Sequence, residues 1–152
     1  MTQLSQHFSL EELTASDLAI RRGLDNSPSA EIVENLKLLC VYLERVRELL
    51  GVPMIVHSGY RSPKVNAAVG GSDKSAHMQG FACDFTAPDF GTPREVARMI
   101  VESDISYDQL IFEGVGNPGA WVHFGIADDN MRKQVLTARF DGGKATYTAG
   151  VA

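Results

Sequence analysis

Two segments far apart in the chain alternate between large apolar residues and small or polar ones. In residues 81–87 (FACDFTA), Asp84 lies on the side opposite to the large apolar residues, and in residues 120–126 (AWVHFGI) His123 does the same. Because successive side chains of a β-strand point to opposite faces, each segment predicts a strand with one core face and one polar face. The chain must therefore build a sheet whose second face carries Asp84 and His123.

Helix signals surround these strands. Ser9 and Glu12 have the spacing of a capping box, which predicts a short helix at this point. Ser27 as cap and Pro28 at the first helical position predict the start of the main helix, whose apolar residues recur every three or four positions until Gly51. Further caps predict a short helical turn after residues 62–63 and a second helix from Thr92 to about Ser103.

The remaining strands complete the expected fold class. Residues 52–60 predict a strand, residues 108–114 and 120–127 predict a hairpin around a turn-rich segment, and the tail predicts another hairpin around residues 141–143. This order of elements predicts an α+β fold, with helices packed on a small, largely antiparallel sheet. At 152 residues we expect a single domain over residues 1–152.

Composition excludes several classes of partner. The formal net charge of −5 gives no broad basic surface, so we expect no nucleic-acid partner. Cys40 and Cys83 both fall among apolar residues and are expected to be buried thiols rather than a disulfide. We expect no membrane span, and the N-terminus lacks the features of a signal peptide, so the protein is expected to be made in the cytoplasm.

His77, Asp84 and His123 form a candidate metal site. Two imidazoles and one carboxylate are a ligand set suited to zinc, and a catalytic site of this kind leaves a fourth position for water. The His77–Asp84 spacing alone is a weak signal, and a single histidine such as His123 can equally pack beside Trp121 and bond a backbone carbonyl. Taken together, the three residues predict a metal site more strongly than any one of them does alone.

The sequence also resembles a known family. The segments HSGYRSPKVNAAVGGSDKSAHMQGFACDF, YDQLIFEG and WVHFGI are similar to peptidase family M15, the zinc D-Ala-D-Ala carboxypeptidases and phage endolysins. The opening, HFSLEELTASDLAIRRGLDNSP, resembles the lead-in of phage and prophage members. The resemblance implies the Hedgehog/D-Ala-D-Ala peptidase type of fold, and Zn²⁺ bound by His77, Asp84 and His123. It further implies cleavage of peptide bonds in the stem peptides of bacterial peptidoglycan.

The same resemblance suggests substrate-binding residues. It makes Arg61 the partner of a substrate carboxylate, which a guanidinium can bind through two hydrogen bonds. The alternative is a surface arginine at the end of a strand. Ser75 either bonds the substrate or stabilises the loop before His77.

The position that carries the general base in this family has no acidic residue here, so another residue must take that role. Well-studied members of the family carry Glu or Asp three residues before the last histidine, and Ala120 stands there. Pairing the two strands around Asn117 would set Glu113 opposite Trp121 and diagonal to His123, within reach of the attacking water. Glu113 is therefore the candidate base, and the alternative is a solvated glutamate at a strand end.

With this resemblance, we expect a monomeric zinc peptidase that acts on the cell wall after release or as part of a phage particle. It leaves open whether the enzyme is a D,D-carboxypeptidase or an endopeptidase. The rival interpretation is a non-catalytic module that keeps the fold and the metal and serves wall binding or virion structure, as the loss of the usual base at Ala120 would allow. A purely structural metal is a third possibility.

Overall fold

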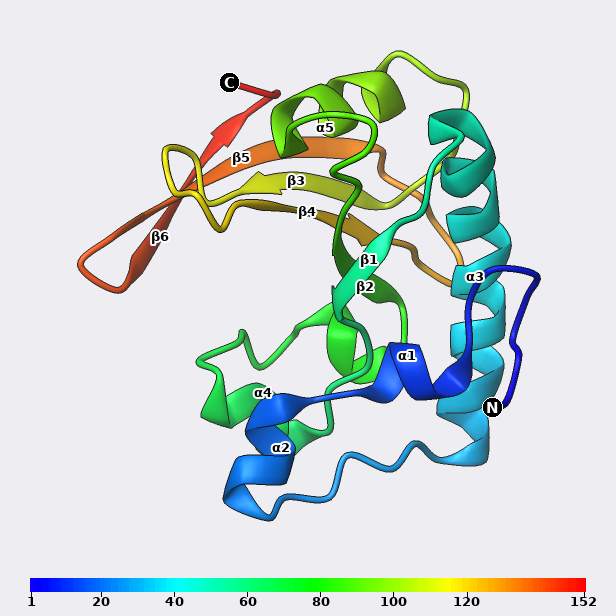
Figure 1. Ribbon diagram of the computed structural model, residues 1–152. Coiled ribbons are helices and arrows are strands. Elements are labelled where there is room, and N and C mark those ends of the chain that lie inside the picture. The colour runs from blue at the N-terminus through cyan, green and yellow to red at the C-terminus, as the bar shows by residue number, and fades with distance from the viewer.

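The computed structural model describes residues 1–152 as an α+β fold built on one six-stranded sheet (Figure 1). The helices are α1 (Leu10–Thr14), α2 (Asp17–Arg22), α3 (Ala30–Leu50), α4 (Pro63–Ala68) and α5 (Pro93–Val101), with a 3-10 turn, η1, at Ala76–Gln79. The strands are β1 (Ile55–Ser58), β2 (Ala82–Thr86), β3 (Gln109–Glu113), β4 (Trp121–Gly125), β5 (Gln134–Asp141) and β6 (Lys144–Ala149). The predicted fold class is confirmed.

The strands lie in the order β1-β2-β4-β3-β5-β6. All neighbours are antiparallel except β3 and β5, which run parallel. The β3–β4 hairpin has the predicted register, with Glu113 opposite Trp121 and Ile111 opposite His123. The last hairpin, β5–β6, turns at Asp141 as expected and extends beyond the rest of the sheet (Figure 1).

Most helix boundaries follow the predicted caps. The capping boxes at Ser9 and Thr92 are both formed. The predicted start of α3 at Ser27 and Pro28 is wrong, because the N-cap is Ser29, whose side chain accepts a hydrogen bond from the N–H of Ile32. The N–H of Ser27 is instead bonded to the side chain of Asp25. The predicted end of α5 near Ser103 is two residues late.

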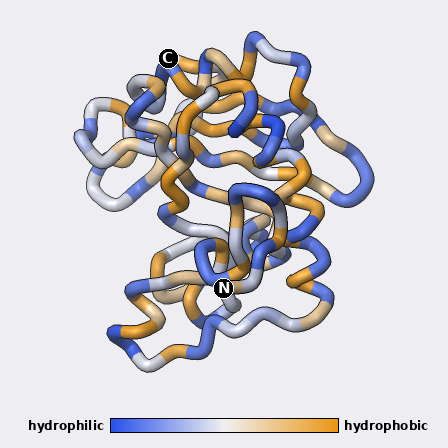
Figure 2. Tube along the Cα trace, turned by 45° about the vertical axis from the view of Figure 1, so that its right-hand side comes forward, coloured by the Kyte–Doolittle hydropathy of each residue, from blue (hydrophilic) through white to orange (hydrophobic).

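The hydrophobic core lies between α3, α5 and one face of the sheet. Apolar residues of the central strands face this core, among them Cys83 and Phe124, and both cysteines are buried free thiols. In Figure 2 the hydrophobic segments run through the interior of the sheet region. Asp84 and His123 lie on the opposite face, which α4 and η1 approach (Figure 1). No helix of the structure has the length and apolar character needed to cross a membrane.

Candidate active site

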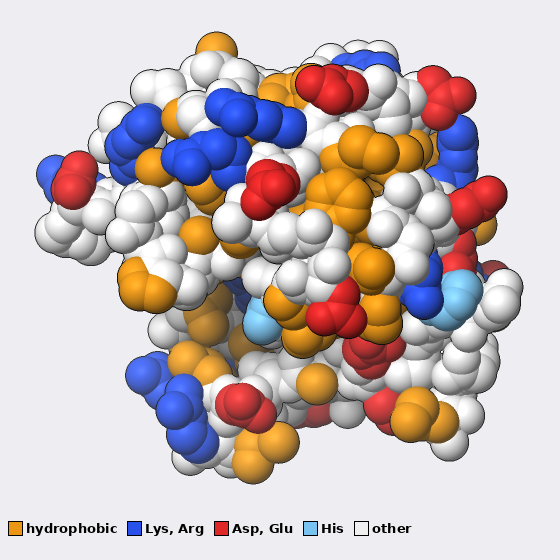
Figure 3. Space-filling model, turned by 45° about the horizontal axis from the view of Figure 1, so that its top comes forward, with side chains coloured by type: hydrophobic (Ala, Val, Ile, Leu, Met, Phe, Trp, Pro, Cys, Tyr) orange, Lys and Arg blue, Asp and Glu red, His pale blue; other side chains and the backbone are white.

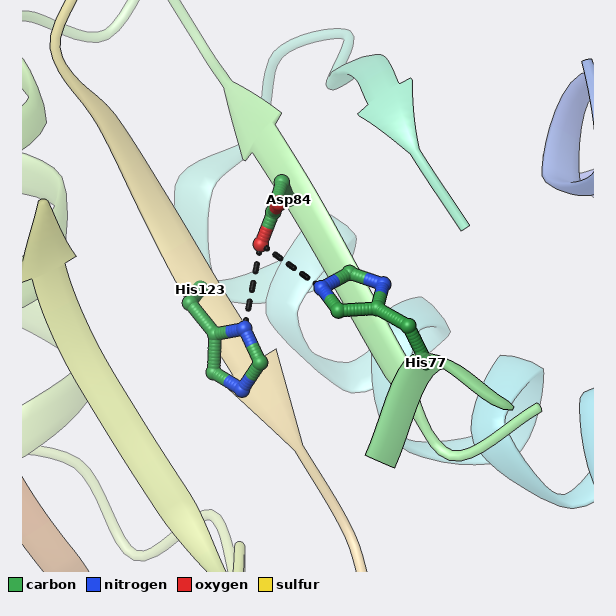
Figure 4. A group of neighbouring side chains, drawn as sticks. All are labelled: His77, Asp84 and His123. Atoms are coloured by element: carbon green, nitrogen blue, oxygen red, sulfur yellow. Dashed lines mark hydrogen bonds and ion pairs between the residues drawn. The ribbon is translucent and has the colours of Figure 1, made fainter. Parts of the chain in front are cut away.

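Three elements bring the predicted ligands together. His77 comes from η1, Asp84 from β2 and His123 from β4, and Asp84 and His123 lie directly opposite each other in the sheet. Both imidazoles present a nitrogen to the same oxygen of Asp84 (Figure 4): His77 Nε2 lies 3.2 Å and His123 Nδ1 lies 3.0 Å from Asp84 Oδ1. All three residues are buried, and one possible ligand atom from each lies within 4.8 Å of the others. The three residues therefore form a group that can hold a metal ion.

The fold fixes the orientation of His77. Its Nδ1 lies 2.7 Å from the carbonyl oxygen of Gly59 and donates a hydrogen bond to it, so Nε2, which faces Asp84, is the nitrogen that can bind a cation. Gly59 itself is confined, because a Cβ at that position would lie 2.3 Å from the carbonyl oxygen of Leu13. Helix α1 thus packs directly against the backbone that orients His77.

Ser75 and Gly80 shape the turn that carries His77. The Ser75 hydroxyl accepts a hydrogen bond from the N–H of His77 and caps η1. Gly80 ends the turn with a φ of +74°, a conformation that glycine adopts without strain. The geometry gives Ser75 the role of stabilising the loop, and a contact between Ser75 and substrate stays a prediction.

Arg61 is held in place by three side chains. Its Nη2 donates to Asp84 Oδ2 at 3.3 Å, its Nη1 to Asn66 Oδ1 at 3.2 Å, and its Nε to Ser58 Oγ at 3.1 Å. The side chain of Arg61 is only 15% exposed, so it is not the free surface arginine that the alternative interpretation described. Two of its five N–H groups have no partner within the protein, which leaves donors for a substrate.

Electrostatics keep Asp84 ionised. Burial alone would raise the pKa of its carboxyl group, but the charges of His77 and His123 and the hydrogen bonds from them outweigh burial and hold the pKa well below its usual range. The remaining oxygen of Asp84 faces Arg61. One carboxylate therefore contacts both histidines and the arginine.

Glu113 lies one pair further along the sheet from His123. Burial raises the pKa of Glu113 and the Asp84 carboxylate raises it further, to about 7, against the lowering effects of His123, Trp121 and Arg61. A carboxyl group with a pKa near neutrality can both accept and release a proton. Glu113 is thus not the fully solvated strand-end glutamate of the alternative interpretation. The usual base position, Ala120, is occupied by a side chain without a titratable group.

Two buried side-chain nitrogen atoms lack a hydrogen-bond partner, Trp121 Nε1 and His123 Nε2, and both lie in this site. Buried polar groups are nearly always paired, so unpaired ones concentrated in one place are typical of a site that a ligand completes. The indole N–H of Trp121 lowers the pKa of Glu113, although its geometry falls short of a hydrogen bond.

Two supporting residues, Asn26 and Asn66, are not among the site residues predicted from the sequence. Asn66 is buried, bonds Arg61 and also donates to the carbonyl of Ser72, and Asn26 donates to the carbonyls of Thr14 and Tyr60. The one available signal was an asparagine on the inner side of the short helix that follows Arg61, where a polar side chain needs a partner.

Comparison with known families identifies the chain. The family model described as Peptidase M15 matches residues 6–124. The chain belongs to the peptidase M15 family. A comparison with curated proteins gave no match. Peptidase M15 proteins are typically metal-dependent, and the matched stretch contains His77, Asp84 and His123. It ends before β5, so the last hairpin lies outside it.

Proposed function

We propose that this peptidase M15 member uses Zn²⁺ to hydrolyse peptide bonds in the stem peptides of bacterial peptidoglycan. The observation that carries the proposal is the buried His77–Asp84–His123 group, with Glu113 in the adjacent position of the same sheet face. Four-coordinate zinc with ligands at roughly 2.0–2.1 Å places neighbouring ligand atoms about 3.3 Å apart. The distances of 3.0 Å and 3.2 Å from Asp84 Oδ1 to the two imidazole nitrogens are compatible with that spacing.

The protein supplies the groups that the reaction needs around the cation. When bound, zinc polarises a carbonyl group and lowers the pKa of coordinated water to about 7, which suits amide hydrolysis at neutral pH. Asp84 and Gly59 fix the two histidines, and Arg61 fixes Asp84. The ligand geometry is therefore set by the fold.

Glu113 serves as general base and then as general acid. Its carboxylate accepts a proton from the water that attacks the scissile carbonyl and delivers that proton to the leaving amine. A pKa of about 7 matches both steps, because the group is a useful acceptor and a useful donor at neutral pH. Such general acid–base catalysis contributes about 10²–10⁴-fold to rate.

Arg61 orients the substrate from the other side of the metal group. Its two unpaired N–H groups can bind a carboxylate of the stem peptide while its other donors stay bonded to Asp84, Asn66 and Ser58. A terminal carboxylate in this position would favour D,D-carboxypeptidase action, and a side-chain carboxylate would favour endopeptidase action. In either case, we place the activity at the bacterial cell wall, reached after release from the cell or within a phage particle.

Mass spectrometry of muropeptides tests this function. Purified peptidoglycan is incubated with the zinc-loaded protein, with its Glu113→Gln variant, and with Glu34→Gln, a control at an exposed position of α3. We expect one new class of fragment from wild type and from Glu34→Gln, and a rate about 10²–10⁴-fold lower from Glu113→Gln. The fragment mass identifies the bond. The absence of any new fragment across several wall chemistries would refute hydrolysis.

A non-catalytic module is the second candidate, because Ala120 replaces the usual base. It predicts that wild type and Glu113→Gln are equally inert on peptidoglycan while both bind zinc. A purely structural metal would instead make chelation unfold the chain. Circular dichroism during chelation separates that outcome from loss of activity with the fold retained.

A further inference from the structure

The β5–β6 hairpin presents aromatic side chains beside the proposed active site. Phe140 and Tyr147 are 45% and 52% exposed, so two large rings of one hairpin reach the surface. Phe140 stacks on Trp121 of β4, with ring centroids 5.9 Å apart and planes inclined by 21°. The stack joins the hairpin to the strand that carries His123.

The register places Trp121 and Tyr147 in one row across the sheet, and Phe140 lies two residues along β5 from that row. Trp121 lies opposite Glu113, Glu113 lies opposite Ala138, and Ala138 lies opposite Tyr147. Residues opposite one another point to the same face, so the row shares the face that carries His123, which is two residues from Trp121 on β4. The aromatic side chains are thus continuous with the catalytic row.

Ala138 allows Tyr147 to approach Glu113. Ala138 is fully buried although it stands on the second strand from the edge of the sheet, so larger neighbours cover its methyl group. Its two neighbours in the row are Glu113 and Tyr147. Burial and the nearby Glu113 carboxylate both raise the pKa of the Tyr147 phenol, in keeping with this proximity. In the space-filling view the surface is hollowed below the projecting hairpin, and a histidine side chain is visible at the inner end of the hollow (Figure 3).

We propose that Phe140 and Tyr147 form the wall of the substrate cleft opposite to Arg61 and pack against the aliphatic part of the peptide beyond the scissile bond. The inference rests on the proposed function and specifies its substrate as a peptide longer than two residues. Arg61 follows β1, at one edge of the sheet, and Tyr147 lies on β6, at the other. A peptide bound at both ends therefore runs across the strands.

The length of that peptide follows from strand spacing. From β4 to β6 there are three steps in the sheet, which span about 14 Å at roughly 4.8 Å per step. About four extended residues cover this distance. A stem peptide is long enough to reach the hairpin from the cation site, whereas a free dipeptide is not.

Steady-state kinetics on a synthetic stem pentapeptide test the wall. We expect the double variant Phe140→Ser/Tyr147→Ser of the full zinc-loaded chain to raise KM by about tenfold with kcat within about twofold of wild type, because the rings contribute apolar contact and not chemistry. Tyr147→Phe should keep the wild-type KM, since it retains the ring. Thr146→Ala, one residue away on the opposite face of β6, is the matched control and should behave as wild type.

Three results would refute the proposed wall. These are an unchanged KM in the double variant, a fall in kcat without a change in KM, and a Tyr147→Phe variant as impaired as the serine variant. Tyr147→Ser alone, at the more exposed ring, replaces the double variant if thermal unfolding shows that the latter has lost its fold. A wild-type protein that cleaves no stem peptide would refute the proposed function, whereas an active wild type with unaffected variants would refute only the wall.

Discussion

The two halves of the site face differ in how firmly their side chains are held. Around Asp84, most polar side chains are bonded within the protein: Arg61 bonds three side chains, and His77 bonds the carbonyl of Gly59. Around Glu113, the indole N–H of Trp121 has no partner, and Tyr147 is half exposed on an edge strand. We call the half around Asp84 the metal half and the half around Glu113 the base half, after their proposed roles. The metal half is held by hydrogen bonds except at Nε2 of His123, and the base half is a set of aromatic and acidic groups open on one side.

The difference corresponds to two physical tasks. A cation site needs ligands fixed before binding, because each ligand that must be reoriented lowers affinity. The proposed base and substrate wall would have to admit a peptide and exchange protons. Burial raises the pKa of Glu113, while the surface beside it stays accessible. The family match ends at residue 124. It therefore includes every residue named in the metal half and leaves out the β5–β6 hairpin, which belongs to the base half.

The largest expected effect is loss of the metal, and it comes from removing a proposed ligand in the metal half. His77→Ala and Asp84→Ala should each lose stoichiometric zinc and all measurable hydrolysis, because two ligands do not form a stable site. Metal analysis of the purified variants checks this. His57→Ala, an exposed histidine on β1 whose ring bonds Thr86, should keep one zinc per chain. One zinc per chain in the two ligand variants would contradict the assignment.

A smaller but substantial effect is expected from Gly59→Ala. The added Cβ would lie 2.3 Å from the carbonyl oxygen of Leu13, so α1 must move away from the backbone that orients His77. We expect a loss of about 2–4 kcal/mol in the free energy of unfolding and a zinc affinity about 10–100-fold weaker. Denaturant unfolding and zinc titration measure the two effects.

Gly119→Ala is the matched control for that substitution. A Cβ at Gly119 meets only Asn117 Oδ1, at 3.5 Å, which is an ordinary contact. Its stability should stay within about 0.5 kcal/mol of wild type. Equal stability of Gly59→Ala and wild type would show that α1 does not constrain the metal half.

The smallest effect concerns Glu113 and is a pH dependence of stability. Its pKa is about 7 in the folded chain against 4.5 for an unperturbed group, so between these pH values the folded state holds a proton that the unfolded state has released. Stability of the zinc-free protein should therefore fall as pH rises through this window. Glu113→Gln removes this contribution and should gain up to about 3 kcal/mol relative to wild type by pH 7.

Denaturant unfolding at several pH values measures this difference. The variant and wild type should be closest at pH 4.5, where both side chains are neutral, and should diverge as Glu113 ionises. A difference that stays constant from pH 4.5 to 7 would mean that Glu113 is solvated, like an ordinary glutamate.

Local patterns predicted much of this molecule. The short connection between β3 and β4 sets their register, so the sequence alone placed Glu113 opposite Trp121. Strand alternation likewise placed Asp84 and His123 on the face away from the core. These features depend on neighbours close in sequence.

Features that depend on distant neighbours could not be predicted. The parallel pairing of β3 with β5 joins strands that β4 separates in the sequence, and the bond between Arg61 and Asp84 requires β1 and β2 to be adjacent. The predicted start of α3 is two residues early because Ser27 and Ser29 are both acceptable caps. In the structure the N–H of Ser27 bonds Asp25, and Ser29 caps the helix.

Because of the position of β5 in the sheet, the sequence of the last hairpin can change independently of the three proposed ligands. Within the sheet, β5 is bonded only to β3 and to its own hairpin partner β6, and none of the three proposed ligands lies on these three strands. Replacing this hairpin by one of different length or side chains would therefore change the surface beside Glu113 without altering any of the three proposed ligands. The fold offers protein engineers a replaceable edge hairpin beside a candidate cation site that is built from other elements.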